Sequence, residues 1–389
     1  MHTQKSQVAL LAIILFAFSC SSPENEESVS EQPLSSDEFI SYKLTEGVSK
    51  VKWSDIIDEI QITRLEETEE SLLSYVTDVH FNNKDQVVFS SGAESNIFTF
   101  SPTGELITFM NRKGEGPEEY DGLQGFWLEG DTVAVYSRGK YIKRYSLMGD
   151  FISSMDVGYE VDYMLSYSGG YALDMFFSVV DDSLFYNVLT LDNNLENRTL
   201  FFPSGPPKGF GIYTGNNTLA RYKSSFIYQR TMSDTIYLHS GLEMKPFIHF
   251  DFGNDWFWKG KGTANYEDID RMFESDLFWN QTAKVSPKLA YLLGWRGTGV
   301  GKKFLVDRVS HKLIELDESG NEEEKYGLTI SHFVDNGVVG SMNSLEVTNL
   351  LNELEDNQWS FTQGTTLDII ESSENPVLLK IKFKDSSEW

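Results

Sequence analysis

Two stretches of the chain, residues 97–107 (IFTFSPTGELI) and residues 142–152 (IKRYSLMGDFI), share one pattern at an offset of 45 residues. In each, a run rich in aromatic and β-branched residues leads into a four-residue turn that ends in glycine, and a second apolar run follows. Glycine suits the left-handed backbone that such a turn requires. A strand, a turn and a second strand recurring at this period are typical of β-propeller blades.

Further copies of the pattern set the expected number of blades. We expect a third copy at residues 313–321 and weaker ones near residues 188–196 and 236–247. Dividing the folded region by the period gives six blades, with expected starts near Ser74, Gln124, Ser166, Gly211, Trp256 and Gly327. No Gly-His or Trp-Asp blade signature is present, so the chain is not an obvious WD40 protein.

The two ends of the folded region are expected to meet in one sheet. A strand at residues 59–65 would complete the last blade beside residues 377–383, which closes the ring and leaves no edge open. Apolar periodicity also predicts two helices, at residues 266–279 in the fifth blade and at residues 344–354. The sequence therefore predicts an all-β fold, a six-bladed β-propeller with a short helical insertion.

The N-terminal residues have the layout of an export signal. Lys5 precedes an unbroken apolar run at residues 8–18, which is too short to span a bilayer as a helix. The run ends at Ala17, Phe18 and Ser19 before the only cysteine, Cys20. This arrangement resembles a bacterial lipobox, whose cysteine carries lipid, and secretion with simple cleavage is the alternative. Two or three acyl chains on Cys20 would make the membrane a stable partner.

These features divide the chain into a lipoprotein signal peptide (residues 1–19), an acidic Ser/Glu-rich tether (residues 20–45) and the propeller (residues 46–389). The tether holds too few apolar residues to bury a core, so it is expected to be disordered. Its acidic start resembles the surface-export signal of Bacteroidota lipoproteins. We therefore predict an outer-membrane lipoprotein on the cell surface, with the periplasmic side as the alternative.

Composition narrows the choice of partners. The chain has 59 acidic and 32 basic residues, a net charge of −27. Such a surface repels phosphate backbones, so we expect no nucleic acid partner. A single cysteine excludes a disulfide within the chain and a metal site built on several cysteines.

The segment that ends Arg112-Lys113-Gly114-Glu115-Gly116-Pro117-Glu118-Glu119-Tyr120 resembles a family signature. It is similar to the G-x-G-P-G-E-[YF] motif of the six-bladed β-propeller lipoproteins of Bacteroidota, whose repeats are related to the NHL type. The resemblance extends over the mature chain and implies its fold and location, but no particular activity. One departure is Glu118, where the family has glycine. A positive φ would strain Glu118.

Two stretches offer candidate binding residues. Loops between propeller blades gather at the mouth of the central channel, which makes Arg112, Lys113, Glu115 and Tyr120 candidates. The alternative is that this loop only shapes a blade crossover. Trp256 and Trp258 could form a sugar-stacking platform or contact a protein partner, with core packing as the alternative.

Candidate metal ligands are few. Asp78 and His80 share one side of an expected strand, as do His249 and Asp251. Each pair could be half of a metal or acid–base site, although structural histidines are the alternative. Oxygen ligands alternate at Asp317, Ser319, Asn321 and Glu323, but the full calcium-loop pattern is missing. We expect no catalytic residue and no cofactor, with calcium or another divalent metal as the alternative.

These observations lead to two hypotheses about function. The first is a cell-envelope lipoprotein that acts as a binding or scaffolding propeller for a glycan, a peptide or an envelope protein. The second is a metal-dependent, lactonase-like or lyase-like propeller enzyme, with His80, His249 and nearby carboxylates as metal ligands in the central channel. Fold analogy alone does not decide between them.

Overall fold

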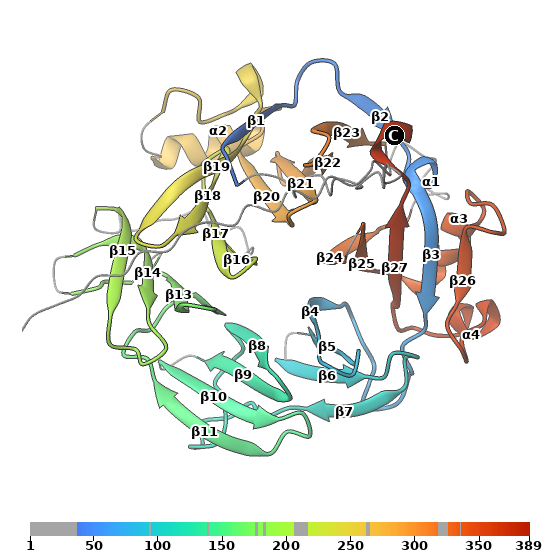
Figure 1. The fold of residues 1–389 in the computed structure, drawn as a ribbon, viewed down its shortest axis with the longest axis horizontal. Coiled ribbons are helices and arrows are strands. Elements are labelled where there is room, and N and C mark those ends of the chain that lie inside the picture. The colour runs from blue at the N-terminus through green and yellow to red at the C-terminus, as the bar shows by residue number, and fades with distance from the viewer. Residues whose placement is uncertain are drawn as a thin grey trace, which may run out of the picture. The chain divides into compact units, whose positions relative to one another are not determined.

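A computed structural model describes residues 37–92, 95–137, 140–175, 178–181, 184–205, 217–261, 265–317, 326–334 and 336–389. The predicted signal, Cys20, most of the tether, Ser319, Asn321 and Glu323 lie outside these residues. Six sheets stand in a ring, each with its first strand nearest the centre (Figure 1), which confirms the six-bladed β-propeller. Within the described residues no helix is both long and apolar enough to cross a membrane.

The first three blades are four-stranded antiparallel sheets. Blade 1 contains β4 (Thr77–Phe81), β5 (Val87–Ser91), β6 (Asn96–Phe100) and β7 (Leu106–Met110). Blade 2 contains β8 (Gly125–Glu129), β9 (Thr132–Ser137), β10 (Tyr141–Ser146) and β11 (Phe151–Asp156). Blade 3 contains β12 (Tyr163–Tyr167), β13 (Gly170–Asp174), β14 (Tyr186–Leu191) and β15 (Arg198–Pro203).

The last three blades each have a fifth strand at the outer edge. Blade 4 contains β16 (Leu219–Tyr222), β17 (Ser225–Gln229), β18 (Thr235–Ser240), β19 (Glu243–Asp251) and β1 (Ile40–Lys43). Blade 5 contains β20 (Asn280–Val285), β21 (Leu289–Arg296), β22 (Gly299–Asp307), β23 (Lys312–Leu316) and β2 (Ser49–Val51). Blade 6 contains β24 (Thr329–Val334), β25 (Gly337–Met342), β27 (Val377–Phe383), β3 (Ile57–Thr63) and β26 (Trp359–Phe361).

The N-terminal part of the described chain crosses three blades before it enters blade 1. Strands β1 and β2 pair in parallel with β19 and β23, and β3 pairs antiparallel with β27. The predicted closure of the ring beside residues 377–383 is therefore confirmed. The folded part also begins before residue 46, because β1 is hydrogen-bonded into blade 4 and buries Tyr42.

The sequence repeat corresponds to the third and fourth strands of blades 1 and 2. Its two turn glycines, Gly104 and Gly149, have φ of 89° and 84°, as the turn requires. The copy expected at residues 313–321 differs, because β23 is the fourth strand of blade 5 and not the third. Residues 297–303 contain several glycines but lack the spacing of a phosphate-binding loop; Gly297 and Thr298 form the turn between β21 and β22, and the rest belong to β22.

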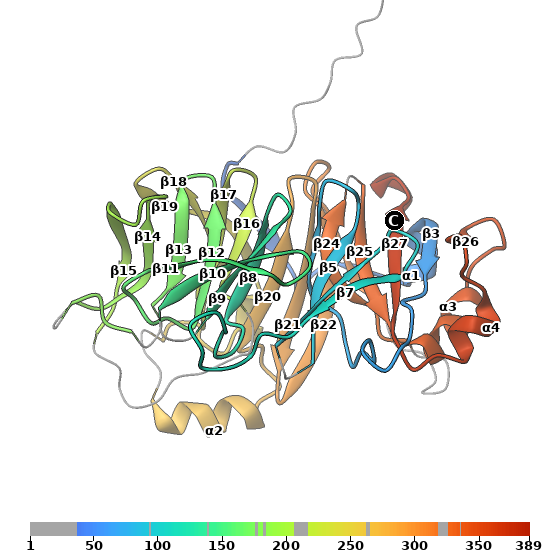
Figure 2. The same ribbon diagram turned by 90° about the horizontal axis from the view of Figure 1, so that it is seen from below.

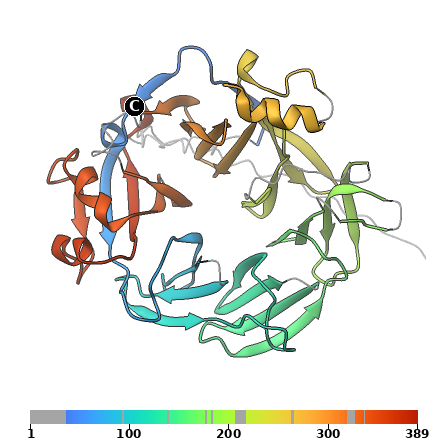
Figure 3. The ribbon, with the colours of Figure 1, turned by 180° about the vertical axis from the view of Figure 1, so that it is seen from behind.

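Short helices lie outside the sheets. Helix α2 (Tyr266–Glu274) confirms the expected insertion before β20 and lies along one face of the ring (Figures 2 and 3). The second expected helix is η3 (Ser344–Glu346) continued by α3 (Val347–Leu351). The other helices in the described part of the chain are α1 (Trp53–Ile56), α4 (Leu367–Glu371), η1 (Gly253–Asp255) and η4 (Ser386–Glu388).

The apolar core is divided among the blades. Each of six buried clusters combines side chains of two neighbouring blades, such as Phe89 and Phe98 of blade 1 with Leu378 of blade 6. Both faces of every blade are therefore packed, as in other closed arrangements of sheets. The innermost strands are left to carry the polar side chains that face the axis of the ring.

Candidate functional site

Polar side chains from five blades meet at the innermost strands of the ring. We call them the channel cluster: Asp78 and His80 on β4, Tyr163 on β12, Arg221 on β16, Lys284 on β20 and His332 on β24. Asp78, Arg221, Lys284 and His332 are exposed to solvent, although protein atoms surround each of them. Because these side chains are accessible to solvent and yet enclosed by protein, we take the centre of the ring that they line, called the channel below, as the candidate site.

The backbone at Asp78 is unusual. Asp78 has φ of 51°, and the register between β4 and β5 shifts between Thr77 and His80. A β-bulge of this kind redirects side chains and is often found beside functional sites, where strained backbone also accumulates. Here Val79 is packed in an apolar cluster, while Asp78 and His80 remain outside it.

Asp78 and Lys284 form the charged pair of the channel. Burial raises the pKa of Asp78, and the positive charge of Lys284 opposes that rise. Burial likewise lowers the pKa of Lys284, and the charge of Asp78 opposes this change. The ammonium group of Lys284 also donates to the carbonyl oxygen of Ser331 at 3.2 Å. Each charge thus partly offsets the desolvation of the other.

Both histidines of the cluster are held neutral. Burial, together with the nearby charges of Arg221 and His332, lowers the pKa of His80 to about 3. Burial and the charge of Lys284 lower the pKa of His332. The His80 ring packs edge-on against Phe126 at 4.7 Å between centroids, and the His332 ring lies 5.7 Å from Phe81. A neutral imidazole has one hydrogen-bond donor and one acceptor.

Arg221 and Tyr163 complete the cluster. The Arg221 guanidinium donates to the Ser166 carbonyl at 2.6 Å and to the Ser166 hydroxyl. Burial raises the pKa of Tyr163, the charge of Asp78 raises it further, and Arg221 opposes both effects. Gly125 keeps the position of Tyr163 open, because a Cβ atom there would lie 2.6 Å from the Met164 carbonyl and 3.3 Å from the Tyr163 ring. Because its pKa is raised, the Tyr163 phenol remains protonated at neutral pH.

The loop predicted to bind a ligand is an anchored crossover between blades 1 and 2. Tyr120 is fully buried, and its hydroxyl donates to the Ser95 carbonyl at 2.7 Å. Glu118 does not have a positive φ, so the backbone strain that a positive φ would cause at this position is absent. The side chains of Lys113 and Glu115 are exposed. The structure does not join this loop to the channel cluster by any contact between described residues.

Two side chains of blade 2 hold the carbonyl groups of this loop. The Lys143 ammonium donates to the carbonyls of Gly116, at 3.3 Å, and Pro117, at 3.1 Å, as well as to that of Glu119. The Tyr145 hydroxyl donates to the Glu118 carbonyl at 2.8 Å. Arg112 is exposed, but its Nε donates to the Gly149 carbonyl of blade 2 at 2.9 Å. These contacts assign the loop a role in positioning the two blades.

The expected aromatic platform lies in the core. Trp256 and Trp258 are 6% and 5% exposed, and they pack in the cluster between blades 4 and 5. Trp256 stacks on Phe252 at 5.1 Å, and the Trp258 indole donates to the Trp279 carbonyl at 2.6 Å. Neither ring offers a free face to a sugar, so the core-packing alternative describes both residues.

The two candidate metal ligands are separated. His80 belongs to the innermost strand of blade 1, whereas His249 lies on β19, the fourth strand of blade 4. The His249 Nδ1 atom is 2.8 Å from the Ser41 hydroxyl, and its Nε2 atom is 3.3 Å from Asp234. Within the described part of the chain, no group of three or more His, Cys, Asp or Glu side chains is arranged to hold a metal ion.

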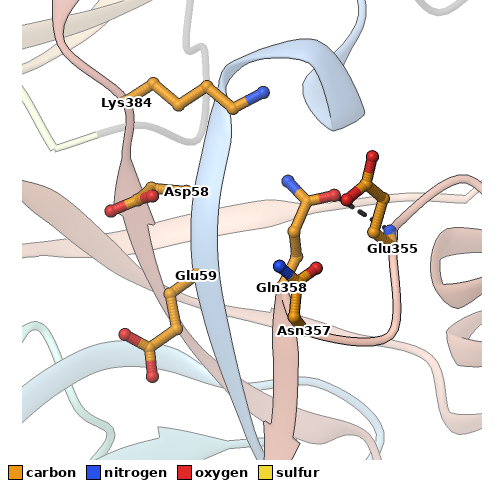
Figure 4. Close-up of a pocket in the computed structure, with 6 residues that line it drawn as sticks. All are labelled: Asp58, Glu59, Glu355, Asn357, Gln358 and Lys384. Atoms are coloured by element: carbon orange, nitrogen blue, oxygen red, sulfur yellow. Dashed lines mark hydrogen bonds between the residues drawn. The ribbon is translucent and has the colours of Figure 1, made fainter.

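A second hollow, of about 380 Å³, lies at the outer edge of blade 6 (Figure 4). It is lined by Asp58, Glu59, Glu355, Asn357, Gln358 and Lys384. Several of these polar groups are already satisfied: Gln358 accepts from the Glu355 amide at 2.9 Å, and the Lys384 ammonium donates to the Asp55 carbonyl at 2.8 Å. Lys382 also pairs with Asp58. The channel is the better candidate because its charges are enclosed.

Sequence reasoning singled out only Asp78 and His80 of the channel cluster. Tyr163, Arg221, Lys284 and His332 each stand alone on a strand and belong to no local motif. The available signal was a polar residue in the first strand of each successive blade. Recognising it requires blade boundaries, and the expected start of blade 5, Trp256, lies well before the observed first strand β20.

Solved structures of low sequence identity resemble this chain. A Bacteroides fragilis protein inferred to be exported matches with a TM-score of 0.66 and 15% identity, over 90% of this chain and all of that one. A DUF4221 family member from Bacteroides vulgatus matches with a TM-score of 0.48 and 12% identity, over 86% of this chain and 99% of that one. At 15% identity the likeness to the Bacteroides fragilis protein shows the fold alone.

Two further comparisons concern the sequence. Among curated proteins no relative of the chain is found. The model of a family described as "Domain of unknown function (DUF4934)" matches residues 40–382, which spans all six blades.

Proposed function

The chain belongs to the DUF4934 family, and we propose that it is an exported binding protein of the cell envelope whose ligand enters the central channel. One observation carries this proposal: the channel cluster brings accessible polar side chains from five blades to one place. Binding sites of folded proteins are concave and contain a few convergent polar groups.

The energetics of the cluster favour a ligand over a purely structural role. Enclosing Lys284, Arg221 and Asp78 costs desolvation energy, and apolar residues would fill the same positions more stably. The left-handed backbone of Asp78 adds strain. Groups that cost stability and remain accessible are typical of functional sites.

Location belongs to the same proposal. The apolar run before Cys20 supports export and lipid attachment, and the Bacteroides fragilis protein of the same fold is inferred to be exported. Display on the outer surface and a relation of the repeats to the NHL type also remain proposals. Palmitate labelling of cells that express the chain tests the anchor, and a Cys20→Ser variant that still incorporates label would contradict it.

A ligand screen tests the channel. The chain without residues 1–20 retains the compact unit that begins at Leu34. Its thermal midpoint should rise with one class in a panel of oligosaccharides, peptides and divalent cations, since about a hundredfold excess over Kd stabilises by roughly 2.7 kcal/mol.

Matched variants locate the binding site. Lys284→Met should abolish the rise, whereas Lys245→Met should keep it, because Lys245 is an exposed residue on β19. A flat panel, or a rise that survives Lys284→Met, would contradict the proposal.

A further inference from the structure

Resting on the proposed function, we infer that the channel ligand is a carboxylated sugar, a uronic acid residue within an oligosaccharide. Arg221 and Lys284 would bind its carboxylate, and the neutral side chains of the channel cluster would bind its hydroxyl groups. The inference follows from three properties of the cluster: its charge, its hydrogen-bonding capacity and its aromatic faces.

The charge of the cluster is opposite to that of the protein. Lys284 faces Asp78, the single carboxylate of the cluster, and Glu129, the carboxylate near Arg221, is bound to Arg144 at 2.7 Å. The cluster therefore carries about one net positive charge in a protein whose net charge is −27. A local cationic site enclosed by protein attracts an anion, and the acidic outer surface disfavours large polyanions.

The guanidinium of Arg221 can donate hydrogen bonds to a ligand and keep its own bonds to Ser166. Ser166 accepts from two of its N–H groups, and a guanidinium has five. These contacts hold the fork in one orientation, which reduces the entropy lost when a carboxylate binds. Lys284 is held in a similar way by the Ser331 carbonyl.

The other members of the cluster suit hydroxyl groups. His80 and His332 are neutral; His332 has one donor and one acceptor, and His80 keeps one of its two ring nitrogens for a ligand because the Phe126 backbone bonds to the other. The Tyr163 hydroxyl is protonated and bonds to Asn217, which leaves it further hydrogen-bonding capacity, while Asp78 accepts. A sugar hydroxyl likewise donates and accepts. A simple phosphate or a peptide carboxylate would use the cations but would leave the remaining hydrogen-bonding capacity of these groups unused, which costs binding energy.

Aromatic side chains lie beside these polar groups. Phe81 is 37% exposed and lies next to His332, and Tyr163 belongs to the cluster itself. The C–H face of a pyranose ring can pack on such rings while its polar edges reach the charged residues. Charge, hydroxyl-matching groups and an accessible aromatic side chain together fit a uronate better than a neutral sugar.

Calorimetric titration with matched ligands tests the inference. Tri-galacturonate and tri-glucuronate are compared with their methyl esters, which keep every hydroxyl and lose the charge. At least one acid should bind the wild-type chain with a Kd about tenfold or more below that of its ester. Equal binding of acid and ester, or no binding of either acid, would overturn the inference without any variant.

Charge variants supply the second measurement. Arg221→Gln and Lys284→Gln should each raise the Kd of the acid about tenfold or more and leave the Kd of the ester nearly unchanged. Lys245→Gln should change neither, since it lies outside the channel. Acid binding unaffected by both channel variants would also overturn the inference.

The two proposals fail differently. A neutral sugar or a peptide whose binding is lost in Lys284→Met would overturn the uronate inference and leave the channel as the binding site. A uronate that binds equally well to every channel variant would overturn both.

Discussion

The protonation state of His80 shows how the fold changes the chemistry of a single side chain. The unfolded chain takes up a proton on this residue near pH 6.5, whereas burial and Arg221 hold the folded-state pKa at about 3. Between these two values the unfolded state binds more protons than the folded state. The free energy of unfolding therefore falls as the pH is lowered through this window. Above pH 6.5 the contribution is complete.

We predict that His80→Gln removes this dependence. Relative to the variant, the wild-type chain should lose stability between pH 6.5 and pH 4, by up to about 1.4 kcal/mol per pH unit. Urea denaturation at constant ionic strength, at pH 7, 6, 5 and 4, measures the difference. Two curves that remain parallel over this range would show that His80 takes up its proton equally well in the folded chain.

The crossover between β7 and β8 shows how one side chain supports a whole element. Lys143 is 7% exposed, and its ammonium group donates hydrogen bonds to three carbonyl groups of the loop. These bonds fix a loop that contains two glycines, residues with a flexible backbone. Burial lowers the pKa of Lys143, and the charge of Glu119 opposes this. Because the donor and the acceptors belong to different blades, the contact fixes one blade against the next.

We predict that Lys143→Met destabilises the chain by about 1–3 kcal/mol, because the carbonyls of Pro117 and Glu119 lose the ammonium group that donates to them. The control is Lys84→Met, whose exposed partner Asp131 lies 3.7 Å away and contributes about 0–1 kcal/mol. Urea denaturation gives the free energies, and hydrogen exchange should show faster exchange at residues 112–120 in the first variant only. Equal effects of the two substitutions would mean that the loop is held by other contacts.

At the scale of the whole molecule, closure of the ring depends on β3. This strand comes from the N-terminal part of the chain and lies between β27 and β26 in blade 6, so the last blade is assembled from both ends. A contact between the two ends carries a high loop-closure cost, and the neighbouring blades regain it by burying their shared clusters.

We predict that a chain beginning at Glu66, which lacks β1 to β3, loses cooperative unfolding and near-ultraviolet circular dichroism. A chain beginning at Trp53 keeps β3 and should still unfold cooperatively, at a lower urea midpoint, because the outer edges of blades 4 and 5 are uncovered. The chain beginning at Glu38 is the control. Cooperative unfolding of the shortest chain would show that the other five blades are stable without closure.

Most of the fold could be predicted from the sequence, because its determinants are local. The turn glycines Gly104 and Gly149, the alternation of side chains along each strand and the 45-residue offset act between residues close in the chain. These patterns were sufficient to predict six blades. The pairing of β3 with β27 was predicted because the last sheet would otherwise have an open edge. The export signal before Cys20 also rests on a local pattern and stays a prediction.

The candidate site depended on the tertiary structure. Asp78 and Lys284 are far apart in the chain and meet only because six sheets bring their first strands to one axis. Tertiary packing also buried Trp258 and turned the Arg112–Tyr120 loop into an anchored crossover. A sequence pattern records which side of a strand a residue occupies. Which strands then face one another, and how much water remains between them, is decided by the packing of the blades.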